Sequence, residues 1–256
     1  MAKTGESCRG LVLRSTDVSE NDKLLTLLTA EYGKITVSAK GARSLKSRYM
    51  PVSQQFAYGE YTFSSKNGYK WLVDASLTES FFSLRSDLVR LALACYVVSV
   101  TEQLALDDQP DNDLLRLTLN TLYMLCEGKR SINHIKSVFE LAAVSCGGFT
   151  PEVDFCGNCS VENGLSYLDT VGGVCLCSNC AARLFPEGVP VSVLPVDLTV
   201  LEAIRFITSP VSKNVFSFRL PDEYERELSH ISEAYLLAQL DCGFKTLSFY
   251  HEVSDQ

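Results

Sequence analysis

The first third of the chain consists of short apolar or β-branched runs separated by polar breaks, a pattern typical of β-strands. The last two of these runs flank Asn67-Gly68, whose tolerance of positive φ suits a two-residue type I′ hairpin turn. Short strands without a helical period between them predict a small closed or half-closed barrel. The expected strands cover residues 10–14, 23–28, 34–39, 56–64 and 69–73.

From about residue 80 the spacing of apolar positions changes from 2 to 3.6, which indicates helices. The segment from Leu88 to Val100 is apolar on all sides and is expected to be buried on most of them. Capping side chains, proline and glycine mark the ends of the later helices. The expected N-caps are Asp113, Ser131 and Asp197, Pro221 is expected in the first turn of the last long helix, and Gly128, Gly147-Gly148 and Gly243 are the expected stops.

These patterns predict an α+β, multidomain protein with an N-terminal barrel and a helical bundle into which a small cysteine-rich module is inserted. Helices before and after the module are expected to belong to one bundle. The predicted segments are 1–79 for the barrel, 80–149 for the first part of the bundle, 150–184 for the module and 185–256 for the second part of the bundle.

The cysteine-rich stretch CGNCSVENGLSYLDTVGGVCLCSNC carries two CxxC pairs, Cys156/Cys159 and Cys177/Cys180, separated by 17 residues. Two thiolates that lie two residues apart can curl round one metal ion, and a second pair at this distance completes a tetrahedron. Four thiolates fill the coordination shell and leave no open position. The spacing therefore predicts one structural, non-catalytic Zn²⁺.

Two other interpretations of these cysteines fit less well. A thioredoxin-like redox site uses a single CxxC, and the second pair at zinc spacing would be coincidental. Two disulfides would need an oxidising compartment, which nothing else in the chain indicates. Cys175 lies two residues before Cys177 and is interpreted as a buried thiol and only a reserve ligand.

Composition is that of an ordinary globular protein, with 46% apolar and 21% charged residues. The polar start MAKTGESCRG has no hydrophobic segment of a secretory signal, and the longest apolar run, Leu91–Val98, is far too short to span a membrane. The cysteines outside the two pairs are expected to be free thiols. These features predict a cytoplasmic protein with no membrane contact.

The net charge of −8 by itself disfavours a nucleic-acid binder, but the charge is unevenly distributed. Residues 1–50 contain nine Lys and Arg and only five acids, so that segment carries +4 and the remainder −12. A positive segment on an acidic body is typical of polyanion binding.

Basic residues are densest in the Gly- and Ser-containing segment 34–50, which has no acid. A flexible loop of this composition lets several cations reach successive phosphates, although a solvated loop that only aids solubility fits the charge equally well. No GxxxxGK[ST] motif is present, so nucleotide hydrolysis has no support. The candidate phosphate contacts are Lys34, Lys40, Arg43, Lys46, Arg48 and, on the first strand, Arg14.

Six aromatic residues lie on the hairpin that follows this segment: Phe56, Tyr58, Tyr61, Phe63, Tyr69 and Trp71. Bases can stack on such rings, whereas barrel core is the expected role of most of the six. Tyr58 and Trp71 are the candidate stacking residues, because each has a polar atom suited to a wet face.

Catalytic arrangements are sparse. The three histidines, His134, His230 and His251, are expected on polar helix faces or in the tail, and no GxSxG, HExxH or zinc-deaminase pattern is present. The acidic cluster from Asp107 to Asp113 is interpreted as a solvated turn and helix cap. We therefore expect a protein that is not an enzyme.

Taken in order, the pieces resemble the RecO family of bacterial recombination mediators. The resemblance lies in SENDKLLTLLTAEYGKITVSAKGARSLKSR (19–48), FELAAVSCGGFTPEVDFCGNC (139–159), CSNC (177–180) and GFKTLSFY (243–250), and spans nearly the whole chain. It implies an N-terminal OB-fold, a helical bundle and an inserted zinc module.

The resemblance also implies function. Family members bind single- and double-stranded DNA, anneal complementary strands without ATP and engage the acidic C-terminal tail of single-stranded-DNA-binding protein. With RecR they help RecA to load onto DNA. The alternative hypothesis is a zinc-stabilised protein-interaction adaptor whose acidic helical part binds partners and whose basic loop is incidental. The sequence does not locate the pocket for the tail.

Overall fold

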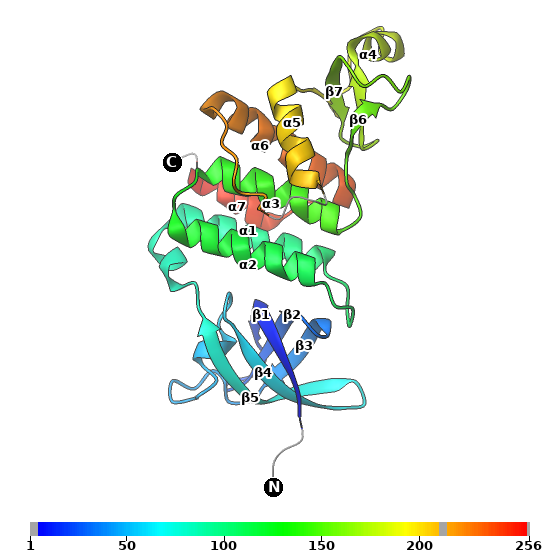
Figure 1. Ribbon diagram of the computed structural model, residues 1–256. Coiled ribbons are helices and arrows are strands. Elements are labelled where there is room, and N and C mark those ends of the chain that lie inside the picture. The colour runs from blue at the N-terminus through cyan, green and yellow to red at the C-terminus, as the bar shows by residue number, and fades with distance from the viewer. Residues whose placement is uncertain (1–4, 210–213, 255–256) are drawn as a thin grey trace. The chain divides into compact units, whose positions relative to one another are not determined.

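The computed structural model describes residues 5–209 and 214–254, which divide into two compact units (Figure 1). The barrel unit comprises Met1–Glu127 and Phe244–Gln256, and the cysteine unit comprises Gly128–Gly243. The chain thus leaves the barrel unit once and returns to it at its end. The helices expected to form one bundle are distributed over both units.

The barrel unit begins with five strands that form a closed barrel in the order β1-β2-β3-β5-β4. All neighbours are antiparallel except β3 and β5, which run parallel where Ser38 pairs with Trp71. This is the strand order of the OB fold, so the predicted barrel is confirmed. The strands are β1 (Glu6–Asp17), β2 (Lys23–Thr29), β3 (Gly33–Ala39), β4 (Tyr58–Lys66) and β5 (Tyr69–Glu79).

The β4–β5 turn has the predicted chemistry. Lys66 pairs with Tyr69, leaving Asn67 and Gly68 as a two-residue turn, and both have positive φ, 51° and 79°. Inside the barrel, alternate residues of each strand form one apolar core that includes Leu25, Val37, Tyr61 and Phe63.

Three α-helices complete the barrel unit: α1 (Leu88–Leu104), α2 (Asn112–Glu127) and α7 (Lys245–Ser254), together with the 3₁₀ turns Pro51–Ser53 and Phe82–Ser86. Helix α1 is buried over most of residues 92–101, as its apolar sequence predicts, and packs against α7 and α2. The α1–α2 loop hydrogen-bonds to β3, where Lys34 N donates to Leu106 O. Among the described helices none has both the length and the apolar content needed to cross a bilayer.

The expected cap of α2 was placed two residues too late. The Asp111 side chain accepts from Leu114 N at 2.9 Å, whereas Asp113 lies within the first turn and pairs with Arg116. An aspartate-rich turn offers several candidate caps, and only the backbone geometry decides between them.

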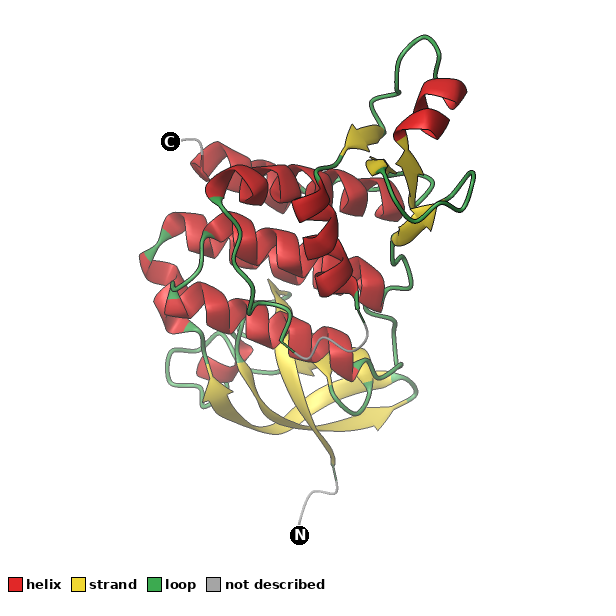
Figure 2. Ribbon diagram, turned by 45° about the horizontal axis from the view of Figure 1, so that its top comes forward, coloured by secondary structure: helices red, strands yellow, loops and turns green. Residues whose placement is uncertain are grey.

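The cysteine unit contains helices and one small four-stranded sheet, whose short strands are drawn in yellow in Figure 2. Its sheet has the order β6-β8-β7-β9. Ser131 and Asp197 cap α3 and α5 as predicted, whereas Pro221 is the residue before α6 and that helix ends at Leu240, before Gly243. The elements are α3 (Ile132–Cys146), β6 (Glu152–Cys156), β7 (Leu165–Asp169), β8 (Val174–Cys177), α4 (Ser178–Leu184), β9 (Val193–Pro195), α5 (Leu198–Thr208) and α6 (Asp222–Leu240).

A buried ion pair joins α3 to α6. The Lys136 side chain is 2% exposed, and its Nζ lies 3.0 Å from Glu140 and 2.7 Å from Glu233. Burial disfavours the ammonium form, but the two carboxylates outweigh it and raise the pKa of Lys136. Ser232 Oγ donates to the Glu140 carboxylate at 2.6 Å, so both charged ends have hydrogen-bond partners.

We expect Lys136→Ala to lower the free energy of unfolding by about 3 kcal/mol, because it leaves buried carboxylates without their cation. Arg116→Ala, which removes the exposed pair with Asp113, serves as the control and is expected to cost less than about 1 kcal/mol. Urea denaturation followed by circular dichroism measures both. Equal effects of the two substitutions would contradict a structural role for the Lys136 pair.

Candidate metal centre and nucleic-acid interface

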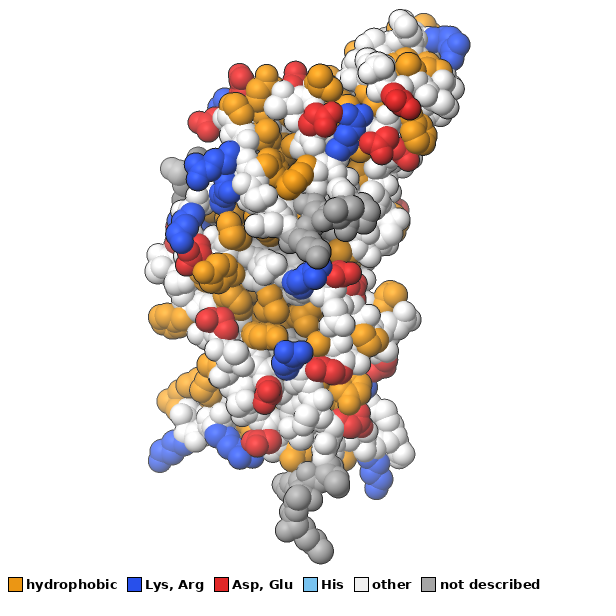
Figure 3. All heavy atoms as spheres, viewed as in Figure 1, with side chains coloured by type: hydrophobic (Ala, Val, Ile, Leu, Met, Phe, Trp, Pro, Cys, Tyr) orange, Lys and Arg blue, Asp and Glu red, His pale blue; other side chains and the backbone are white. Residues whose placement is uncertain are grey.

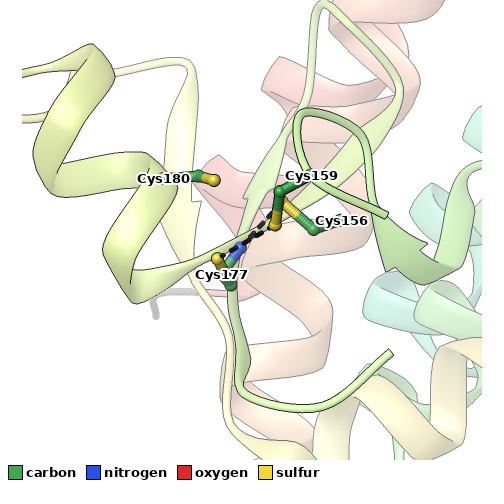
Figure 4. A group of neighbouring side chains, drawn as sticks. All are labelled: Cys156, Cys159, Cys177 and Cys180. Atoms are coloured by element: carbon green, nitrogen blue, oxygen red, sulfur yellow. Dashed lines mark hydrogen bonds between the residues drawn. The ribbon is translucent and has the colours of Figure 1, made fainter. Parts of the chain in front are cut away.

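The four predicted ligands come together in the cysteine unit. Cys156 ends β6, Cys159 follows in the next turn, Cys177 ends β8 and Cys180 lies in α4 (Figure 4). Parallel pairing of β6 with β8 brings the two CxxC pairs side by side. Their Sγ atoms all lie within 4.8 Å of one another, and Cys159 and Cys177 Sγ are 3.8 Å apart.

This geometry fits a tetrahedral metal ion. Zn–S bonds of about 2.3 Å place the sulfurs of a four-thiolate site about 3.8 Å apart, which the Cys159–Cys177 distance matches. Donors also point at the sulfurs: Cys177 N lies 3.4 Å from Cys156 Sγ, and Asn158 Nδ2 lies 3.1 Å from Cys180 Sγ. Such donors orient and stabilise thiolate ligands, so the residues present could hold a metal.

The pKa values of two thiols in the cluster, Cys156 and Cys159, are shifted in opposite directions. Burial raises the pKa of Cys156, but hydrogen bonds from the backbone at Cys177, Asn158 and Cys159 bring it down to about 6. A backbone hydrogen bond from Val161 lowers the pKa of Cys159, but hydrogen bonding to the neighbouring cysteines, with desolvation, outweighs it and raises the pKa to about 12. Four adjacent thiols cannot all ionise without a cation, and a bound metal would remove this conflict.

Cys175 stays outside the cluster. Its side chain is fully buried on β8, and burial raises its pKa to about 12. Among the described residues it is not part of the group of four clustered cysteines.

The prediction that the histidines lie on polar helix faces is right for His230 and wrong for His134. His230 is exposed on α6, but His134, expected on a polar helix face, is buried against the ring of Phe218 with centroids 4.7 Å apart. Burial lowers the pKa of His134. The polar residues next to His134 in the sequence gave no indication of this burial, because Phe218 comes from a distant segment.

The basic loop after β3 lies at one rim of the barrel, where Figure 3 shows Lys and Arg side chains along the lower edge. Lys40 and Lys46 are exposed on this loop. Within residues 5–209 and 214–254 neither makes an ion pair. Their ammonium groups are available to an anionic ligand.

The two arginines of the loop form ion pairs with exposed aspartates, which a phosphate could replace. Arg43 Nε lies 3.2 Å from Asp17, and its guanidinium also donates to Ser19 O in the β1–β2 loop. Arg48 lies 3.3 Å from Asp74 and donates to Val73 O on β5. Both ion pairs are exposed, and exposed pairs contribute only about 0–1 kcal/mol.

Lys34 and Arg14 are placed differently. Lys34 is half-buried, donates to Glu102 O at 3.1 Å and lies 3.6 Å from Asp107. Arg14 lies 2.8 Å from Glu102. Both cations therefore face the helical part of the barrel unit and are compensated there.

Of the six aromatic residues, Phe56, Tyr61 and Phe63 are buried, and Tyr61 and Phe63 belong to the apolar core of the barrel. Tyr58 is half-buried at the start of β4, opposite Leu11 and Glu79. Trp71 is half-buried near the β4–β5 turn, at a distance along the sheet from Tyr58.

Trp71 lines an open pocket with Lys40, Lys66, Asn67 and Tyr69. Neither Lys66 nor Tyr69 is among the binding residues predicted from the sequence. Their position in the sequence could have indicated them, because both flank the Asn67-Gly68 turn. In the OB fold the β1–β2 and β4–β5 loops and the face of strands β2 and β3 contact oligonucleotides. The pocket joins the basic loop to that turn.

Comparison with known proteins identifies the family. The model described as recombination protein O N terminal matches residues 1–81, and that described as recombination protein O C terminal matches residues 85–248. The chain belongs to the recombination protein O (RecO) family. The predicted resemblance to RecO proteins is thereby confirmed over both units.

Individual relatives agree with the family models. The DNA repair protein RecO of Acetivibrio thermocellus is 31% identical over 242 residues, which is 94% of each chain. That of Symbiobacterium thermophilum is 29% identical over 245 residues, also 94% of each chain. The RecO protein of Bacillus pumilus is 34% identical over 174 residues, 68% of each chain.

Proposed function

We propose that this RecO family member is a DNA-binding recombination mediator of DNA repair and not an enzyme. It binds single- and double-stranded DNA and anneals complementary strands without ATP. With RecR it helps to load RecA onto DNA coated by single-stranded-DNA-binding protein, whose C-terminal tail it engages. We place this activity in the cytoplasm. The observation that carries the proposal is the cluster of available cations at the loop rim of the OB-type barrel.

Five side chains form the proposed phosphate contacts. Lys40, Lys46 and Lys66 are exposed and make no ion pair within the described part of the chain, and Arg43 and Arg48 have only exposed aspartates that a phosphate can displace. Lys66 takes the place first assigned to Lys34, since Lys34 and Arg14 are compensated by Glu102 and Asp107.

Annealing follows from the electrostatics of this rim. Two complementary strands repel each other through their phosphates as they approach. A basic surface that neutralises phosphates on both lowers that barrier and leaves the base edges free to pair. No bond is made or broken, so neither ATP nor a catalytic residue is required.

We propose Zn²⁺ as the metal of the four-cysteine site, with a structural role. A full shell of thiolates suits this ion and leaves no position for a substrate or an activated water. Its contribution would be to hold the turn after β6 against β8 and α4. The module then supports the fold of the cysteine unit and does not take part in DNA chemistry.

The second candidate function is a zinc-stabilised adaptor that binds proteins through its acidic surface and has no significant affinity for DNA. The charge of −12 beyond residue 50 supports it. The two candidates differ in one respect that can be measured, namely whether the rim cations contribute to binding of an oligonucleotide.

Binding of a labelled single-stranded oligonucleotide is expected to weaken with salt, with a log–log slope near −3.5 for about five phosphate contacts. Replacing both Lys40 and Lys46 by Gln removes two contacts and should reduce the slope to about −2. Fluorescence anisotropy between 50 and 300 mM salt measures both values. A flat affinity of the unmodified protein over this range would favour the adaptor.

Charge reversal separates a local from a general electrostatic effect. Lys40→Glu with Lys46→Glu should abolish annealing, while Arg226→Glu with Lys245→Glu, the same change at exposed positions on α6 and α7, should leave it nearly intact. Annealing of complementary oligonucleotides gives the readout. Equal losses in the two double variants would mean that only net charge matters.

Cys159→Ser is expected to lower the bound zinc from one ion per chain and to reduce the stability or yield of the protein, because three thiolates hold the metal less tightly than four. Elemental analysis and thermal unfolding measure these effects. The oligonucleotide affinity of the folded fraction should stay the same. A Cys159→Ser protein that is fully folded yet fails to bind DNA would overturn the structural role of the metal.

Annealing of strands precoated with single-stranded-DNA-binding protein tests the partner assignment. The reaction should proceed with the intact coat protein and slow markedly when its last few acidic residues are removed, since the proposed contact is then lost. Naked strands provide the control. Equal rates on both coated substrates would argue against recognition of the tail.

A further inference from the structure

A pocket beside the β4–β5 turn has features that phosphate binding alone does not explain. It has a volume of about 380 Å³ and is lined by Lys40, Lys66, Asn67, Tyr69 and Trp71. A second hollow of about 420 Å³ shares Trp71 and Lys66 and extends toward Phe63 and Ser64. Trp71 thus lines both hollows.

Two aromatic rings form one wall. Tyr69 and Trp71 are two residues apart on β5 and so project from the same face of the strand. Their ring centroids are 6.1 Å apart and the planes differ by 26°, an offset stack. Tyr69 is 52% exposed and Trp71 is half-buried, so the stack is partly open to solvent.

The polar atoms around the rings suit an anion with an aromatic part. Lys40 and Lys66 contribute ammonium groups and Asn67 contributes an amide, and among the described residues no carboxylate lines the pocket of Tyr69 and Trp71. In the second hollow Glu6 is the acidic member. A planar ring with phosphates on either side matches this combination better than an aliphatic or cationic ligand does.

We infer that this pocket is a base-binding subsite, in which one unpaired base of a DNA single strand stacks on Trp71 while Lys40 and Lys66 contact the flanking phosphates. The inference rests on the proposed DNA binding and deepens it. A base inside a duplex has both faces covered by its neighbours and cannot enter. The subsite therefore adds affinity for single strands only, and Tyr69, not Tyr58, is the ring that acts with Trp71.

Trp71 is the only tryptophan in the chain, so its emission directly reports what contacts its ring. The experiment titrates the full protein with a thymine oligonucleotide, with an abasic oligonucleotide of equal length and with a duplex, and records tryptophan emission and anisotropy of the labelled DNA together. We expect strong quenching by the thymine strand and little by the abasic strand or the duplex, although all three bind.

Substitutions of Trp71 form the second part of the experiment. Stacking is worth about a five- to hundredfold change in affinity per base, so Trp71→Leu should weaken binding of the thymine strand by about tenfold and leave the duplex and abasic strand unchanged. Trp71→Phe should recover most of that loss. Tyr123→Leu, which removes an exposed ring on α2, is the matched control and should change none of the three affinities.

The outcomes separate the subsite from the function on which it rests. If the thymine strand binds by anisotropy while Trp71 emission stays constant and the abasic strand binds equally well, the subsite is wrong and DNA binding stands. Quenching of the same size by the duplex would also overturn it, since a polyanion nearby would then suffice. If no DNA binds at all, the proposed function fails and the subsite fails with it.

Discussion

The arrangement of the barrel unit depends on how β1 is shared between two neighbours. Its first half, Glu6–Leu11, pairs with β4, and its second half, from Gly10 on, pairs with β2, with a bulge between Val12 and Arg14. A strand that bends in this way closes the sheet and leaves β1 without a free edge. Closure also forces β3 and β5 together at Ser38 and Trp71. The basic loop that leaves β3 and the turn that enters β5 consequently share one rim.

The α1–α2 loop fixes the other end of β3. The backbones of Lys34 and Asp107 form a bridge, and Gly33 is packed so closely that a Cβ there would lie 2.0 Å from Gln109 O. The acids of this loop neutralise Lys34 and Lys70, which lies 3.1 Å from Asp108. Cations thus end up in two classes. Lys34 and Lys70 are compensated, whereas Lys40, Lys46 and Lys66 make no ion pair within the described part of the chain, so an acidic protein can still present a local positive surface.

The cysteine-rich module must be held together although it contains few residues. Its sheet is too small to bury a core of its own, and its strands are short. Four cysteines, at the ends of β6 and β8, in the turn after β6 and in α4, bring these pieces within reach of one ion. Hydrogen bonds to the helices also hold the module, as where the Tyr235 hydroxyl of α6 donates to Phe149 O just ahead of β6.

Local features of this protein were determined by the sequence itself. The Asn67-Gly68 turn, the caps Ser131 and Asp197 and the two CxxC pairs depend on residues within a few positions of one another, so their chemistry is legible along the chain. What the tertiary structure decided depends on distant partners. It divided the helices between two units and paired Asp111 instead of Asp113 with the first turn of α2. It also buried His134 under Phe218 and turned Lys34 toward Asp107 and Lys66 toward Trp71. A charge or ring is available for binding only if nothing remote in sequence covers or compensates it, and that is a property of the fold.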